Sequence, residues 1–235
     1  MKGLVLKQTP GWTRRDFTVA LGSGLIVGAS SPLSAAFAAT GTAAAGTPAP
    51  GSKTILVVGD SLSAEYGLKR GSGWVALLEK KLADQKIAAT VRNASISGDT
   101  TSGGRSRLPA LLKSVQPTHV VIELGGNDAL RGLPLSMTED NLAQMTRTAQ
   151  QAGAKVLLVG MQIPPNYGAD YGRRFSAAFE NVARANKAGL VPFFLKGVGD
   201  GADATAMFQA DRIHPKEEAH PLMLDNVWPQ LKKLL

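Results

Sequence analysis

The stretch Thr54-Ile55-Leu56-Val57-Val58-Gly59-Asp60-Ser61-Leu62-Ser63 decides the fold. Its first five residues are apolar or β-branched, which is typical of a buried strand, and a glycine ends the run. The chain then turns and places Ser61 just beyond the carboxyl end of the strand. In an open parallel α/β sheet, ligands bind at that edge. A Gly-Asp-Ser turn alone is weak evidence, because the same tripeptide also occurs as an ordinary polar turn.

Four more short apolar segments follow, and helical patterns separate them. The expected strands cover residues 89–93, 119–124, 155–159 and 190–194, and the expected helices begin near residues 73, 105, 138, 174 and 216. Strands that alternate with helices in this way predict a parallel sheet with helices on both faces and right-handed crossovers. Pro192 predicts that the last strand lies at an edge of the sheet.

The first 53 residues do not look like part of a folded domain. Thr13-Arg14-Arg15-Asp16-Phe17 resembles a twin-arginine export signal, a weakly apolar stretch covers residues 19–37, and Ala36-Phe37-Ala38 fits a signal-peptidase site. We therefore expect a signal peptide at 1–38, a flexible linker at 39–53 and one folded domain at 54–235. A membrane anchor is the alternative, which glycine and serine in the apolar stretch disfavour. The mature protein is then expected in the periplasm or outside the cell, without stable membrane insertion.

Composition excludes several function classes. The chain has no cysteine, which excludes a thiol nucleophile, a cysteine-bound metal, a disulfide framework and a lipidated cysteine. The formal net charge is +8, of which residues 1–53 contribute +4 and the remainder +4. No basic run stands out in the expected domain, so the sequence gives no support to nucleic-acid binding.

Five polar or small residues follow the predicted strands. Ser61 follows the first strand, Gly98 the second and Asn127 the third, whereas Asp211 and His214 follow the fifth. The carboxyl ends of parallel strands meet at one edge of a sheet, so these residues are expected to share a crevice.

The residue types in this group suit acyl transfer. A serine hydroxyl needs a base to take its proton, and His214 can act on Ser61 in that way. Asp211, three residues before the histidine, can hold the imidazole in one tautomer. A tetrahedral intermediate needs fixed donors, which the backbone N–H groups of Ser61 and Gly98 and the amide of Asn127 can supply.

These residues lie in four sequence blocks that resemble the signature blocks of the SGNH (GDSL) hydrolases. The blocks are Gly59-Asp60-Ser61-Leu62, Ser97-Gly98-Asp99-Thr100, Gly125-Gly126-Asn127-Asp128 and Asp211-Arg212-Ile213-His214-Pro215. The resemblance implies a flavodoxin-like three-layer α/β/α sandwich with five parallel strands. It also implies a Ser61–His214–Asp211 triad, an oxyanion hole of Ser61, Gly98 and Asn127, and no metal or cofactor.

Longer strings, residues 93–100 and 123–128, are similar to the bacterial periplasmic branch of that family, whose members are described as arylesterase, lysophospholipase L1 and acyl-CoA thioesterase I. The resemblance thus implies a monomeric serine esterase that acts on aryl and alkyl esters, lysophospholipids and thioesters. A cell-envelope carbohydrate O-deacetylase and a catalytically dead binding module on the same fold remain alternatives. Residues on loops beside the site are candidates for an acyl groove: Leu130, Leu133, Ile163, Pro164 and Tyr167.

The loop at residues 161–168 is shorter than its counterpart in that branch, which leaves the preferred acyl length open. Of the other two histidines, His119 is expected to be structural and His220 to lie on the surface.

Overall fold

The computed structural model describes residues 52–200, 203 and 205–235. The predicted signal peptide, and the predicted linker up to residue 51, lie outside the described residues.

Five parallel strands form one sheet, in the spatial order β2-β1-β3-β4-β5. The strands are β1 (Lys53–Gly59), β2 (Ala89–Asn93), β3 (His119–Glu123), β4 (Lys155–Val159) and β5 (Gly189–Val191). The predicted parallel α/β fold is confirmed, and so is the edge position of the last strand. β1 begins one residue before the run that predicted it, at Lys53, which pairs with Ala89 of β2.

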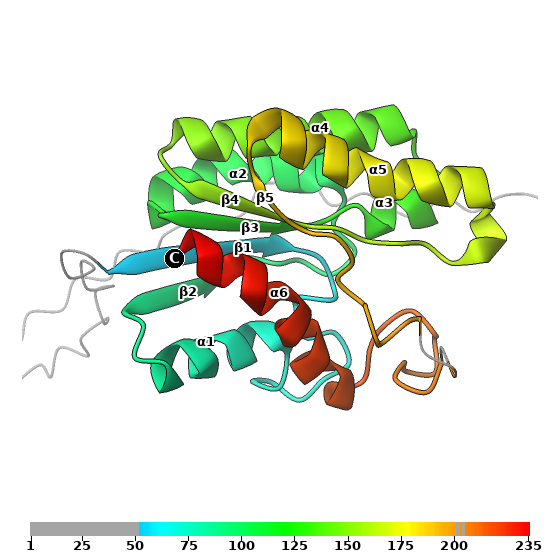
Figure 1. Cartoon of the computed structure of the whole chain (residues 1–235), viewed down its shortest axis with the longest axis horizontal. Helices are drawn as coiled ribbons and strands as arrows, with labels where there is room; N and C mark the ends of the chain where they lie inside the picture. The colour runs from blue at the N-terminus through cyan, green and yellow to red at the C-terminus, as the bar shows by residue number, and fades with distance from the viewer. Residues whose placement is uncertain (1–51, 201–202, 204) are drawn as a thin grey trace, which may run out of the picture. The chain divides into compact units, whose positions relative to one another are not determined.

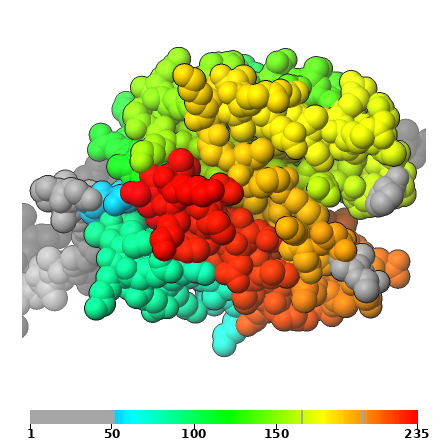
Figure 2. Space-filling model, viewed as in Figure 1, coloured from blue at the N-terminus to red at the C-terminus, as the bar shows by residue number. Residues whose placement is uncertain are grey.

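Helices cover both faces of the sheet (Figure 1). One layer consists of α1 (Trp74–Asp84) and α6 (His220–Leu234), which pack on each other. The other consists of α2 (Thr101–Val115), α4 (Leu135–Gln151) and α5 (Ala169–Asn186), with α4 packed between its two neighbours. In Figure 2 the chain from β5 to α6 fills the surface between these two layers.

The core lies on both faces of β1 and β3. Ile55 to Val58 of β1 are fully buried, and every residue of β3 is buried as well. Strands enclosed on both faces read as continuous apolar runs rather than alternating ones, which explains why these two were the clearest in the sequence. The chain adds β2 on one side of β1 and then β3, β4 and β5 on the other side. Such a switch point lies between β1 and β3, and ligands bind in the crevice that forms there in open parallel sheets.

Several helices begin earlier than their apolar periodicity predicted. α2 begins at Thr101 rather than 105, because the Thr100 hydroxyl caps it by accepting from the Gly103 N–H at 3.3 Å. Two glycines in its first turn hide this start from a sequence pattern. α4 begins at Leu135 rather than 138, and α5 at Ala169 rather than 174.

Two short helices were not predicted, namely α3 (Gly126–Leu130) and η1 (Pro165–Tyr167). Each is too short to show a helical period. The last helix, expected from residue 216, begins with the 3₁₀ turn η2 (Glu217–Ala219) and continues as α6 from His220. None of the helices within the described ranges is long and apolar enough to cross a membrane.

The prediction for His220 was wrong. Its side chain is buried, with 2% exposed, and Nδ1 accepts a hydrogen bond from the Trp74 N–H at 3.0 Å. This bond joins the first turns of α1 and α6. His119 is also buried, and its ring lies 2.9 Å from the Leu234 carbonyl oxygen, as expected of a structural histidine.

Candidate active site

Ser61, His214 and Asp211 form a continuous chain of polar contacts. His214 Nε2 lies 2.9 Å from Ser61 Oγ, and His214 Nδ1 lies 2.6 Å from Asp211 Oδ2. Ser61 occupies the turn directly after β1, whereas the other two residues lie in the loop between β5 and α6. Residues 150 positions apart in the sequence thus meet at the carboxyl edge of the sheet.

A tight turn presents the histidine. Asp211 Oδ1 accepts from the N–H groups of Ile213 and His214, both at 3.0 Å. Arg212, between Asp211 and Ile213, adopts the left-handed conformation, with φ at 58°. The carboxylate therefore holds its own turn with one oxygen and the imidazole with the other.

These bonds stabilise the ionised form of Asp211. The hydrogen bond from His214 lowers the pKa of Asp211 to about 2, and the two backbone N–H groups add to the effect. An ionised carboxylate at Nδ1 favours the tautomer that carries its proton there. Nε2 is then free to accept the Ser61 hydroxyl proton.

The N–H groups of Ser61 and Gly98 are available as donors. Neither has a hydrogen-bond acceptor among the described residues of the protein. Gly98 has φ at 77°, a backbone conformation that strains any residue with a side chain. Turns after β1 and β2 thus each leave an N–H group unused at this edge of the sheet.

Asn127 is held in place by Asp60. Its Nδ2 donates to Asp60 Oδ2 at 3.0 Å, and the second N–H of the amide has no acceptor among the residues that the structure describes. Asp60 Oδ1 accepts from the Leu62 N–H at 3.0 Å. Burial raises the pKa of Asp60 to about 6, and these two hydrogen bonds oppose the rise.

A second carboxyl group, that of Glu123, lies behind the turn that carries Ser61. Glu123 Oε2 accepts from Ser63 Oγ at 2.7 Å, and Ser63 Oγ accepts from Trp74 Nε1 at 3.0 Å. A Cβ on Gly59 would lie 2.8 Å from Glu123 Oε2, so only glycine fits there. Complete burial raises the pKa of Glu123 well above its usual value, and the charge of Asp60 raises it further.

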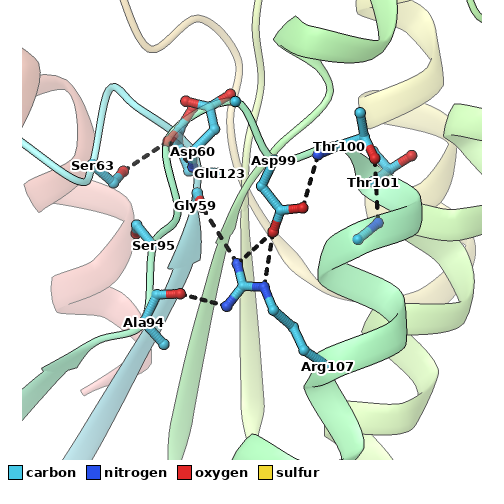
Figure 3. A network of polar contacts seen from close by, with 12 residues as sticks. Gly59, Asp60, Ser63, Ala94, Ser95, Asp99, Thr100, Thr101, Arg107 and Glu123 are labelled. Carbon is cyan, nitrogen blue, oxygen red and sulfur yellow. Dashed lines mark hydrogen bonds and ion pairs between the residues drawn. The ribbon is translucent and has the colours of Figure 1, made fainter. Parts of the chain in front are cut away.

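Arg107 ties the ends of β1 and β2 together (Figure 3). Its guanidinium donates to the Ala94 carbonyl oxygen and, at 3.4 Å, to that of Gly59. It also forms an ion pair with Asp99 at 2.8 Å. Gly59 lies two residues before Ser61, and Asp99 directly follows Gly98. One side chain of α2 therefore fixes both loops that carry the predicted backbone donors.

Asp128 fixes Asn127, the third predicted donor, relative to Gly98, the second. It is fully buried, and it accepts hydrogen bonds from the Thr101 N–H at 2.9 Å and from the Thr138 hydroxyl at 3.3 Å. Thr101 opens α2, three residues after Gly98, and Asp128 directly follows Asn127. The carboxylate thus joins the start of α2 to α3.

Gln209 connects the loop after β1, which carries Ser61, with the loop between β5 and α6, which carries His214. Its Nε2 donates to the Tyr66 carbonyl oxygen at 3.0 Å and to that of Pro215 at 3.1 Å. Its backbone N–H donates to the His214 carbonyl oxygen at 2.8 Å. The Tyr66 ring packs on the His214 imidazole, with 4.3 Å between ring centroids.

The five candidate groove residues differ in their surroundings. Leu130 and Tyr167 are exposed, as is Pro164, whereas Leu133 is half-buried and Ile163 packs against the core. Two surface hollows, of about 420 and 800 Å³, lie elsewhere and include none of these residues, nor Ser61 or His214. In the described ranges no three acidic or histidine side chains gather in a way that suits a metal ion.

Sequence reasoning missed the residues that hold the site, namely Tyr66, Arg107, Glu123 and Gln209. One of them left a signal, because Glu123 is an acid inside the apolar run 119–124. Buried acids need a specific partner.

Comparison with known proteins identifies relatives over most of the chain. The model of the GDSL-like Lipase/Acylhydrolase family matches residues 57–222. Esterase TesA of Pseudomonas aeruginosa is 56% identical over 183 residues, which cover 78% of this chain and 90% of the relative. Thioesterase 1/protease 1/lysophospholipase L1 of Escherichia coli strain K12 is 42% identical over 182 residues, or 77% of this chain and 85% of the relative.

A solved structure agrees in fold. The psychrotrophic esterase EstA from Pseudoalteromonas, inhibited by monoethylphosphonate, matches with a TM-score of 0.72 at 41% identity, over 77% of this chain and 97% of its own. Fold and relatives together define a serine hydrolase that acts on ester bonds. The chain belongs to the GDSL-like lipase/acylhydrolase family.

Proposed function

We propose that this chain is an exported esterase that hydrolyses aryl and alkyl esters, lysophospholipids and thioesters through a Ser61–His214–Asp211 triad. The observation that carries the proposal is the polar chain through these three residues, with distances of 2.9 and 2.6 Å. Both distances lie within the range in which a base can take a proton directly.

Acylation begins when Ser61 Oγ attacks the carbonyl carbon of the ester. His214 Nε2 takes the serine proton, and Asp211 stabilises the imidazolium that forms. The carbonyl oxygen becomes an oxyanion, which the N–H groups of Ser61 and Gly98 and the free N–H of Asn127 bind. The imidazolium then protonates the leaving alcohol or thiol, and the acyl group remains on Ser61.

Deacylation repeats these steps with water. His214 takes a proton from water as water attacks the acyl-enzyme, and the same three donors bind the second oxyanion. Collapse of this intermediate returns the proton to Ser61 and releases the acid. Oxygen and sulfur esters pass through the same type of intermediate, so the triad itself does not discriminate between them.

The groove sets the preferred acyl length. Leu130, Leu133, Ile163, Pro164 and Tyr167 are proposed to line it, and each methylene buried there contributes at most about 0.8 kcal/mol. The lining is apolar but not extensive, and the loop at residues 161–168 is short and contains two prolines, so contact is expected to end after a few carbons. On soluble esters we expect the rate to peak at short to medium chains.

Export rests on residues 1–38, whose twin-arginine pattern and Ala36-Phe37-Ala38 site lie outside the described residues. An exported enzyme meets lysophospholipids and exogenous esters, whereas acyl-CoA is a cytoplasmic metabolite. We therefore place the natural substrate among esters available in the periplasm or outside the cell.

The test is a panel of p-nitrophenyl esters from acetate to palmitate, below their critical micelle concentrations. Wild type is compared with Ser61→Ala and with Ser114→Ala, a control at the far end of α2. We expect Ser61→Ala to lose about 10⁴-fold in kcat and the control to lose nothing. A folded Ser61→Ala variant with a tenth of the wild-type rate would refute the proposal. Activity on acetate alone would favour a carbohydrate deacetylase.

A further inference from the structure

The exposed large hydrophobic side chains of the described residues all lie at the carboxyl edge of the sheet. Each follows a different strand, β1 to β5 in turn: Tyr66, Ile96, Leu130, Tyr167 and Ile213. Their exposed fractions run from 38% for Tyr167 to 53% for Ile96. The loops and short helices that carry them lie beyond the arrowheads of the strands, on the right in Figure 1. We call these five residues the apolar rim.

The rim surrounds Ser61 rather than extending from it in one direction. Ser61 follows β1, Ile96 follows β2 on one side of that strand, and Leu130 and Tyr167 follow β3 and β4 on the other. Neighbouring strands lie about 4.8 Å apart, so the strands from β2 to β4 span about 14 Å. A single acyl chain leaves the serine in one direction and cannot cover both sides.

Cations adjoin the rim. Arg131 follows Leu130 and Arg212 precedes Ile213, and both side chains are exposed and form no ion pair within the described part of the chain. Arg131 donates to the Gly98 carbonyl oxygen at 2.7 Å, so its charge lies beside the predicted oxyanion hole.

The carboxylates of the same loops have internal donors. Asp211 is bonded to His214, Asp203 accepts from the Thr205 N–H at 3.0 Å, and Asp200 accepts from the Gly197 N–H. Arg131 and Arg212 therefore present charges with which no carboxylate of the described residues forms an ion pair, and such charges suit an anionic partner.

We propose that the apolar rim docks the enzyme on the surface of anionic phospholipid, with Ser61 facing the lipid. Apolar side chains among cations are the pattern of proteins that bind such an interface. A partner that covers this edge also covers Ser61, so it must itself supply the ester. Lipid does so, whereas a protein partner would block the site. In this one respect the inference rests on the proposed function.

The absence of cysteine from the chain allows a direct test. Single cysteines replace Ile96 and Tyr167 on the rim, and Lys113 near the opposite end of α2 as a control, all in a full-length Ser61→Ala background that does not consume lipid. Each carries a polarity-sensitive fluorophore. Vesicles contain phosphatidylglycerol, or phosphatidylcholine alone, with and without nitroxide-labelled lipid as a quencher.

We expect the fluorophores at 96 and 167 to shift to the blue and to be quenched on anionic vesicles, and the one at 113 to respond to neither. Equal responses at all three positions would overturn the proposal, because binding would then run through another part of the chain. Silent probes at 96 and 167 would overturn it as well, and would favour an acidic protein as the partner.

Charge is tested in the same background by vesicle co-sedimentation. Arg131→Gln and Arg212→Gln are each expected to weaken binding to anionic vesicles about fivefold at low salt, against no change for Lys86→Gln and Lys113→Gln. If the two lysine variants lost as much binding as the two arginine variants, the effect would be one of net charge in general. That result would contradict docking through the rim. Hydrolysis of p-nitrophenyl acetate by wild type reports the proposed function separately, since this ester needs no lipid surface.

Discussion

Replacement of Asp60 by Asn tests how far the proposed oxyanion hole depends on a residue that is not itself one of its donors. The carboxylate uses one oxygen for the Leu62 N–H and the other for Asn127 Nδ2, both at 3.0 Å. An asparagine side chain has nearly the same shape but a single acceptor oxygen. One of the two donors must therefore face an NH₂ group.

The expected loss follows from the kind of bond removed. A buried hydrogen bond to a charged acceptor contributes about 1.5–3 kcal/mol, and about 1.4 kcal/mol corresponds to tenfold in rate. If the hydrogen bond to Asn127 is the one that is lost, Asp60→Asn lowers kcat by roughly 10- to 100-fold. KM then changes little, because the amide acts on developing charge. Asp140→Asn, an exposed aspartate on α4, is the control.

The same variant has a signature in stability. Burial raises the pKa of Asp60 to about 6, so between about pH 4 and 6 the unfolded chain releases a proton that the folded protein retains. The free energy of unfolding of wild type then falls as pH rises through this window. Asp60→Asn should show a weaker fall in urea unfolding at pH 4, 5 and 6. Wild-type kcat together with an unchanged pH dependence would refute the assignment of Asp60 as the residue that positions Asn127.

Three further outcomes are expected. Asn127→Ala should lower kcat by about 10²–10³-fold on p-nitrophenyl butyrate, and a pure KM effect would instead assign Asn127 to substrate binding. Gln209→Glu keeps the side-chain shape but sets a carboxylate against two carbonyl oxygens, so labelling of Ser61 by a fluorophosphonate should slow at least tenfold. Gln209→Met only removes the donors and should slow labelling less. Equal labelling rates in wild type and both variants would contradict the predicted link between the loop after β1 and the loop before α6. Arg14→Lys with Arg15→Lys should leave the precursor uncleaved in the cytoplasm, whereas normal processing would point to the general secretory route.

The fold was predictable because β1 and β3 are buried on both faces. Their residues appear in the sequence as uninterrupted apolar runs, and polar residues stop each run at the same edge. Helix starts were less predictable, because capping contacts set them. Thr100 caps α2, which begins at Thr101, four residues before the apolar pattern, and two glycines lie in its first turn.

The residues that hold the site in place were beyond sequence reasoning for a related cause. Gln209 is bonded to the carbonyl oxygen of Tyr66, 143 positions away, and Arg107 to that of Gly59, 48 positions away. Acceptors of this kind are backbone atoms, which every residue provides equally. A sequence pattern therefore carries no trace of such a pair, and only the folded chain identifies it.

The proposed short groove and the proposed docking through the apolar rim are consistent with one another. If the protein contacts only the first carbons of an acyl chain, the remainder of a long chain must stay in another apolar medium during hydrolysis. A soluble ester offers no such medium, so its longer chains gain nothing and the rate declines. At a lipid surface the remainder stays among other acyl chains, at no cost in exposed apolar area. Acyl preference should therefore depend on presentation: on lysophospholipid in anionic vesicles, wild type should lose the decline with chain length that it shows on monomeric esters. An identical decline in both formats would argue that the groove alone selects the substrate.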